Sequence, residues 1–163
     1  MYNTAMISQK RDIELLRLAV DAARAAREHG NHPFGAVMAD GDGHLLLTAE
    51  NTVETDSDCT GHAETNLVRM ASKKYDSDFL KECTLYTSTE PCSMCATAIF
   101  WSNIRRVFYA LPESGLYSAV DDSSEDVLQI PCREIFERGR KNIEVQGPFI
   151  EEEAAAVHEG FWT

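Results

Sequence analysis

A histidine, a glutamate and two cysteines stand where the sequence changes from a loop or strand pattern into a helical one. His62 and Glu64 lie in "TGHAETNLV", and Cys92 and Cys95 lie in "EPCSMC". One imidazole and two thiolates are the protein ligands of a catalytic zinc ion that keeps its fourth tetrahedral position open. Thiolates beside a helix N-terminus are stabilised by the helix dipole and by unpaired N–H groups. The pattern predicts that His62, Cys92 and Cys95 bind one Zn²⁺ per subunit.

Glu64 is the predicted catalytic residue. It follows His62 by two positions, so its carboxylate can reach a zinc-bound water without being a ligand. Zinc lowers the pKa of bound water to about 7, which makes a hydroxide nucleophile available, and a carboxylate can carry its proton to a ring nitrogen and a departing amine. The joint pattern H-x-E and P-C-x-x-C is the signature of zinc deaminases.

Other interpretations of these residues stay open from the sequence. Glu64 could merely complement a helix dipole, and Cys92 and Cys95 could be buried thiols of a core helix. Cys59 precedes His62 by three positions. Together with His62, Cys92 and Cys95 it could form a closed Cys3His site, which is typical of a structural zinc module without catalysis.

The elements around these residues alternate between helix and strand patterns. Apolar residues recur at helical spacing from Ser8 to His29, and two apolar segments flanking Gly41-Asp42-Gly43 indicate a β-hairpin. Further helices are expected from about Gly61, at 91–102, 126–138 and 150–162, and further strands at 83–89, 105–111 and 142–147. Pro131 is expected to kink the helix at 126–138 or to delay its start. The order predicts one α/β domain over residues 1–163. It is expected to be a three-layer α/β/α sandwich with a mixed five-stranded sheet, antiparallel in the first hairpin and parallel in the remainder.

The composition disfavours several classes of function. The net charge of −12 argues against sequence-independent binding of nucleic acid, which needs clustered Lys and Arg. No apolar run approaches the roughly 20 residues that span a bilayer, and the N-terminal residues lack the pattern of a signal peptide. We therefore expect a cytoplasmic protein that acts on a small molecule, with no membrane partner and with nucleic acid disfavoured.

Three stretches of the chain are similar to a known family. They are "HPFGAV" at 32–37, "HAE" at 62–64 and "STEPCSMCATAIFWS" at 88–102. All three resemble the cytidine deaminase-like superfamily, in particular its bacterial branch of guanine deaminases and tRNA adenosine deaminases. The resemblance runs from about residue 12 to the end. It implies a cytidine deaminase-like fold, a zinc-bound hydroxide, hydrolytic loss of ammonia from an amino-substituted nitrogen heterocycle, and a homodimer.

The resemblance also implies contacts to the substrate. Asn51 matches an asparagine that hydrogen-bonds the substrate, Phe34 matches a residue beside the bound ring, and the N–H of Ala63 matches a contact to a ring carbonyl. Asn51 and Phe34 could instead be a strand end and a core residue. "VDDSS" at 120–124 resembles the acidic segment that meets the amino and ring N–H groups of the purine in guanine deaminases. Asp122 is the closer match and Asp121 the alternative, although either could be a solvated loop charge.

Aromatic residues provide the last candidates. Guanine deaminases of this branch place a C-terminal aromatic ring over the pocket, so Phe161 or Trp162 could cover the pocket of its own or of the partner subunit. Trp101 is a further candidate for the substrate site, but a core or dimer contact is favoured for it.

The acidic segment favours a guanine-like purine base as the substrate. An anionic carboxylate accepts hydrogen bonds from the N–H donors of such a base and would repel a phosphate. A tRNA adenosine deaminase uses the same zinc site on a flipped base, so it stays an alternative, as do cytosine and other amino-heterocycles.

Overall fold

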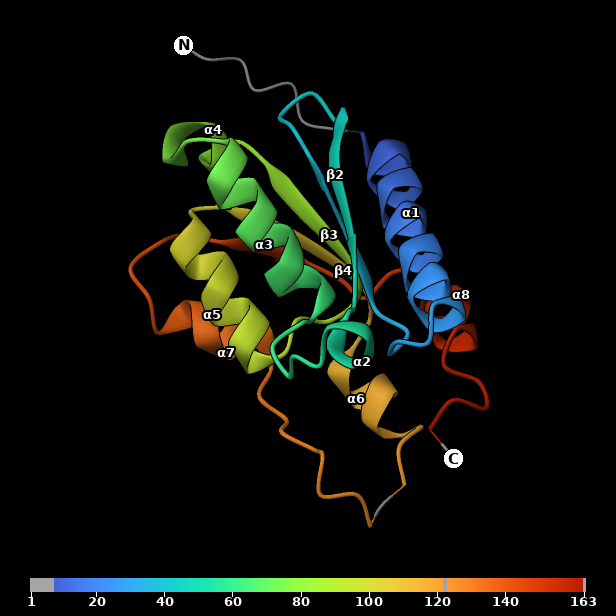
Figure 1. Cartoon of the computed structure of the whole chain (residues 1–163). Coiled ribbons are helices and arrows are strands. Elements are labelled where there is room, and N and C mark those ends of the chain that lie inside the picture. Colours follow the sequence, from blue (N-terminus) through green and yellow to red (C-terminus); the bar gives the residue numbers. More distant parts are fainter. Residues whose placement is uncertain (1–7, 122, 163) are drawn as a thin grey trace.

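The computed structural model describes residues 8–121 and 123–162. Its centre is a mixed five-stranded sheet in the order β2-β1-β3-β4-β5 (Figure 1). The strands are β1 (Gly35–Ala39), β2 (Leu45–Glu50), β3 (Thr84–Thr89), β4 (Arg106–Leu111) and β5 (Glu144–Gln146). Strand β1 pairs antiparallel with both β2 and β3, whereas β3, β4 and β5 run parallel. The predicted mixed sheet with an antiparallel hairpin is therefore confirmed.

Helices cover both faces of the sheet (Figure 1). Helices α1 (Gln9–Glu28) and α8 (Glu151–Ala156) pack on one face, and α3 (Ala63–Lys74), α5 (Ser93–Ser102) and α7 (Cys132–Glu137) form the opposite layer. Three short helices lie in the connections: α2 (Val53–Asp56), α4 (Ser77–Lys81) and α6 (Glu113–Tyr117). This is the α/β/α arrangement that the sequence predicts.

Successive side chains of the strands pack alternately in the two hydrophobic cores, one on each face of the sheet. Val37 packs in the core beneath α1, while its neighbour Met38 packs in the core beneath α3 and α5, and both are fully buried. Period-two alternation in a strand places successive side chains on opposite faces. Burial of each such side chain stabilises the fold by about 1.5–3 kcal/mol.

Gly35 allows the first helix to approach the sheet closely. A Cβ atom at this position would meet the backbone nitrogen of Ala23 and the backbone oxygen of Ala19. The absence of a side chain therefore brings α1 against β1, directly after Phe34.

The elements differ from the sequence-based expectation in three places. Helix α7 begins only at Cys132, because Pro131 lacks an N–H and holds the preceding residue in an extended conformation. The last helix ends at Ala156, and residues 157–161 form turns that fold the C-terminal aromatic residues back. The short helices α2, α4 and α6 were not predicted, since four or five residues show no hydrophobic period.

The N-terminal ends of α3 and α5 lie side by side at the lower end of the view in Figure 1, next to α2 and α6. His62 is the N-cap residue of α3, and Cys92 is the N-cap residue of α5. The fold therefore brings the two sequence motifs to one end of the molecule. Within the described residues, no helix is long and apolar enough to cross a membrane.

Candidate active site

The three predicted metal ligands form one compact group. The candidate ligand atoms of His62, Cys92 and Cys95 all lie within 4.8 Å of one another. His62 Nδ1 is 3.5 Å from the sulfur of Cys92 and 3.6 Å from that of Cys95. A tetrahedral zinc ion with Zn–S near 2.3 Å and Zn–N of 2.0–2.1 Å separates such atoms by about 3.6 Å. The donor set and its spacing therefore fit zinc.

Helix starts set the positions of these three ligands. His62 and Cys92 have the extended backbone of N-cap residues, and Cys95 follows one turn into α5. The hydroxyl of Thr65 on α3 lies 3.3 Å from the sulfur of Cys95 and links the two helices. The side chain of Asn66 donates hydrogen bonds to the carbonyl of Glu50 and to Thr52 beside the sheet, which anchors the start of α3.

The two thiols have opposite pKa shifts. A hydrogen bond from the Cys95 thiol, supported by His62, lowers the pKa of Cys92 to about 4. The same contact and burial raise the pKa of Cys95 well above its usual value. Zinc binds cysteine as the thiolate, so ligation by both sulfurs releases protons and zinc affinity rises with pH.

Cys59 does not join the metal group. Its side chain is exposed and lines the same cavity, but its sulfur is not among the three atoms that lie within 4.8 Å of one another. Within the part of the chain that the structure describes, the group has three protein ligands. This geometry supports the open zinc site over the closed Cys3His site.

Glu64 lies beside the metal group on the first turn of α3. Its side chain is only 5% exposed, and it lines the cavity next to His62. The hydroxyl of Thr87 on β3 donates a 2.8 Å hydrogen bond to Glu64 Oε1 and fixes the carboxylate. Burial raises the pKa of Glu64 from its ordinary value. A raised pKa makes the carboxylate a stronger proton acceptor than a solvated glutamate, which suits it to take a proton from water.

The cavity in front of the metal group has a volume of about 450 Å³. This is within the range of pockets for small ligands. Its walls come from five parts of the chain: the segment before β1, the segment from α2 to α3, the β3–α5 junction, the loop after β4 and the C-terminal segment after α8. Besides His62, Glu64 and Cys92, the lining residues are His32, Phe34, Val53, Cys59, Thr89, Glu90, Leu116, Tyr117, Val120, Ser124, Asp126 and Trp162.

Two predicted aromatic residues lie at this cavity. Phe34 and Trp162 both line it, with ring centroids 6.0 Å apart. Trp162 Nε1 donates a hydrogen bond to Nδ1 of the buried His158, which positions the indole. Phe161 instead packs against His32 and beneath the guanidinium of Arg27, outside the lining.

Asn51 and Ala63 lie close behind the lining. Asn51 is 1% exposed, and its Oδ1 accepts a hydrogen bond from the N–H of Val53, which itself lines the cavity. Ala63 is fully buried as the first residue of α3, between His62 and Glu64. The first N–H groups of a helix have no partner within that helix, so the Ala63 N–H is available to an acceptor.

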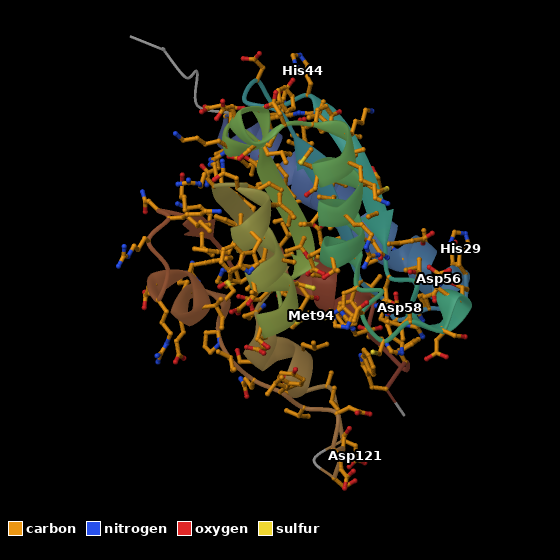
Figure 2. The ribbon with its side chains drawn as sticks, turned by 60° about the vertical axis from the view of Figure 1, so that its left-hand side comes forward. His29, His44, Asp56, Asp58, Met94 and Asp121 are labelled. Atoms are coloured by element: carbon orange, nitrogen blue, oxygen red, sulfur yellow. The ribbon has the colours of Figure 1, made fainter. Side chains whose placement is uncertain are left out.

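Two other predicted residues, Trp101 and Asp121, are not among the residues that line the cavity in the described chain. Trp101 is 73% exposed on α5 and is absent from the lining, so a dimer contact stays a prediction for it. Asp121 lies at the outer tip of the loop after β4 (Figure 2), where its carboxylate accepts a hydrogen bond from the N–H of Ser123. Asp122 lies outside the described residues.

Sequence reasoning missed Asp126, Tyr117, Glu90 and His32 as lining residues. Asp126 supplies the only carboxylate that the described part of the loop after β4 contributes to the cavity. It stands four positions from Asp122, in a segment without periodicity, so no pattern indicates which acidic residue lines the cavity. Glu90 and His32 had a usable signal, since each lies inside a motif that carries the family resemblance.

Glu113 is a buried carboxyl group close to the cavity. It is 3% exposed, its Oε1 accepts a hydrogen bond from the Ile130 N–H, and its Oε2 has no partner among the described residues. Burial, together with the charges of Glu90 and Cys92, raises its pKa to about 7. The folded state therefore binds a proton that the unfolded chain releases near pH 4.5.

Replacing Glu113 with glutamine is expected to change how stability depends on pH. The stabilisation linked to the protonated carboxyl is complete below about pH 4.5 and is lost as the pH rises through about 7. The variant lacks this loss of stability. The difference in melting temperature, variant minus wild type, should therefore be larger at pH 8 than at pH 5. Thermal unfolding of the zinc-loaded proteins at both pH values measures this. An equal difference at pH 5 and pH 8 would contradict the assignment.

Comparisons with known proteins agree with this geometry. The family model of the cytidine and deoxycytidylate deaminase zinc-binding region matches residues 9–111. A probable cytosine deaminase of Schizosaccharomyces pombe is 43% identical over 154 residues, which cover 94% of this chain and 93% of the relative. The guanine deaminase of Bacillus subtilis is 38% identical over 104 residues, covering 58% of this chain and 66% of the relative.

A solved structure shares the fold. It comes from a study of A-to-I editing by tRNA:A34 deaminases at the wobble position of transfer RNA, and it superposes with a TM-score of 0.70 at 29% identity, covering 89% of this chain and 99% of the other. The predicted fold class is confirmed by this likeness. The chain therefore belongs to the family with the cytidine and deoxycytidylate deaminase zinc-binding region, and it is a zinc-dependent hydrolytic deaminase that acts on C–N bonds.

Proposed function

We propose that the protein deaminates a free nucleobase, with a guanine-like purine as the preferred substrate. The observation that supports this is the composition of the cavity: a three-ligand metal group and Glu64 at its base, Phe34 and Trp162 at its sides, and the carboxylate of Asp126 on the loop after β4. The aromatic faces suit a planar ring. A carboxylate accepts the amino and ring N–H donors that distinguish a guanine-like base.

Each residue of the base of the cavity has a distinct task in this proposal. His62, Cys92 and Cys95 hold the zinc ion, which when bound supplies a Lewis acid that lowers the pKa of water to about 7. Glu64, held by Thr87, accepts a proton from the attacking water and delivers it to the ring nitrogen. The C–O bond forms first, while the ring C=N bond becomes a single bond and its nitrogen takes that proton. The exocyclic C–N bond then breaks as the C=O bond forms, and ammonia leaves with the second water proton. The reaction therefore consumes one water and yields one oxo-heterocycle and one ammonia.

The charges around the cavity favour a free base over a polynucleotide. Glu54, Asp56 and Asp58 follow the lining residue Val53 on the α2 segment, and Figure 2 places Asp56 and Asp58 on the same side of the molecule. Asp126 adds a further negative charge within the cavity wall. A phosphate backbone needs neutralising Lys and Arg side chains, whereas the residues that line the cavity in the described chain include neither, so the cavity and its acidic neighbours disfavour tRNA.

Cytosine is a second candidate substrate. The probable cytosine deaminase of Schizosaccharomyces pombe is 43% identical to this chain and matches 94% of its length. A pyrimidine is smaller than a purine and would leave more of the roughly 450 Å³ cavity to water.

Ammonia release from a panel of substrates tests this proposal. The zinc-loaded protein is assayed with guanine, cytosine and adenine, with their nucleosides, and with a tRNA bearing a wobble adenosine. We expect the highest kcat/KM for guanine and at least about tenfold lower values for the nucleosides, because the ribose must displace cavity contacts. Turnover of cytosine alone would support the second candidate. Turnover of the tRNA alone would overturn the proposal for free bases.

A further inference from the structure

The loop after β4 forms one wall of the cavity but contains none of the proposed metal ligands and does not contain Glu64. We call residues 113–121 and 123–132 the pocket loop. It contributes the following lining residues: Leu116, Tyr117, Val120, Ser124 and Asp126. The base of the cavity, by contrast, is built on α3 and α5. Something must fix the pocket loop relative to those helices if the wall is to select a substrate.

Glu90 contacts both ends of the pocket loop at once. Its Oε1 accepts a 3.1 Å hydrogen bond from the N–H of Glu113, and its Oε2 accepts a 2.9 Å hydrogen bond from the N–H of Cys132. These two N–H groups begin helices α6 and α7, where they lack partners within the helix. A single carboxyl side chain therefore connects two helix starts, one through each of its oxygens.

The backbone of Glu90 connects this contact to the metal group. Glu90 follows the last residue of β3 and precedes Pro91 and Cys92, and its own N–H donates a 2.8 Å hydrogen bond to the carbonyl of Leu111 at the end of β4. The side chain that holds the pocket loop thus stands two residues from a metal ligand. Displacement of the carboxylate would shift the cavity wall relative to its base.

Two further contacts close the pocket loop above Glu90. Glu113 Oε1 accepts the N–H of Ile130, and the hydroxyl of Tyr117 donates to the carbonyl of Leu128. Both join the outgoing and returning halves of the loop. Among the residues of the described chain that make these loop contacts, Glu90 is the one that lies in the β3–α5 junction. Its carboxylate therefore connects the loop to the segment that carries the metal ligands.

We propose that Glu90 is a positioning residue for substrate selection, whose carboxylate holds both ends of the pocket loop against the metal-bearing junction. The selection part of this inference rests on the proposed deamination of a free base. The claim that Glu90 fixes the position of the loop does not depend on that function, because it concerns only the contacts of its carboxylate with two backbone N–H groups. Glu90 acts on the substrate through the loop in this proposal, since each of its carboxylate oxygens accepts a backbone N–H from one end of the loop.

Replacement of Glu90 with glutamine removes one of the two acceptors and keeps the shape of the side chain. The KM for the preferred free base should rise about tenfold, while kcat changes by less than about threefold because Glu64 and the metal ligands stay in place. The preference for guanine over cytosine should fall. Glu137→Gln is the matched control, since Glu137 is exposed on α7 and has no hydrogen bond to the pocket loop in the described chain.

Hydrogen exchange supplies a readout that does not depend on any substrate. Peptides covering residues 112–132 of the zinc-loaded Glu90→Gln protein should exchange faster than in the wild type, while peptides of α1 exchange equally. Unchanged exchange in 112–132 together with an unchanged KM would overturn the inference. Faster exchange with no turnover of any free base by the wild type would leave the positioning contact supported and the proposed function refuted.

A second variant approaches the same contact from the loop side. Cys132→Pro removes the N–H that Glu90 Oε2 accepts, at the first position of α7, where proline is tolerated. It should also speed exchange in 112–132 and raise KM. If Glu90→Gln fails to fold or loses its zinc, this variant decides: the same two changes support the inference, and wild-type exchange and KM overturn it.

Discussion

Glu64→Gln is expected to lower kcat by about 10²- to 10⁴-fold without a loss of zinc, because general acid–base catalysis contributes that much in enzymes. The amide keeps the size of the side chain and can still accept the hydrogen bond from Thr87. It cannot take a proton from water at neutral pH. The bound zinc should stay at one per chain, since Glu64 is not a member of the ligand group.

Stability separates this catalytic role from a structural one. Glu64 is buried, and burial raises its pKa. The ionised carboxylate therefore lowers the free energy of unfolding. The melting temperature of Glu64→Gln should equal or exceed that of the wild type. Glu137→Gln, an exposed replacement of the same kind, should leave both kcat and zinc unchanged. Steady-state kinetics with zinc analysis measures this, and retained turnover in Glu64→Gln would refute the proton-transfer role.

Cys92→Ser is expected to lose both zinc and activity, whereas Cys59→Ser should lose neither. A serine hydroxyl is not ionised at neutral pH, so the variant offers two strong ligands in place of three. Changes to residues that only support metal ligands cost about 10- to 100-fold in affinity, and removal of a ligand should exceed that. The turnover of Cys92→Ser should therefore fall by more than about 100-fold at limiting zinc.

The Cys59 variant is the matched control and the test of the open site. Both cysteines line the same cavity, but only Cys92 has its sulfur in the ligand group. Metal analysis after dialysis against a weak chelator distinguishes them. Loss of zinc from Cys59→Ser would indicate a closed four-ligand site and would contradict the catalytic interpretation.

The metal group could be predicted from the sequence because each half of it is local. The spacing of His62 and Glu64 fixes their relation within one helix start, and that of Cys92 and Cys95 does the same in another. Only the contact between the two helix starts depends on the tertiary fold. Alternating strands and helices predict that meeting, since each helix follows a strand of one sheet.

The cavity wall could not be predicted in the same way. The pocket loop has no hydrophobic period, and its course past the cavity depends on long-range contacts such as those of Glu90 with Glu113 and Cys132, so the sequence does not indicate that Asp126 lines the cavity. The C-terminal aromatic residues were harder still to assign. The last helix ends at Ala156, and the turn beyond it decides that Trp162 lines the cavity while Phe161 packs outside.

The central claim is that this zinc site hydrolyses the C–N bond of a free nucleobase. The most direct measurement is ammonia release from guanine by the zinc-loaded protein, by the same protein after zinc removal, and after zinc is restored. The account predicts one ammonia for each molecule of oxo product. The rate of ammonia release should fall by at least about 100-fold when zinc is removed and should recover when zinc is restored. Protein that holds one zinc per chain and releases no ammonia from guanine, cytosine or any other free base would contradict it.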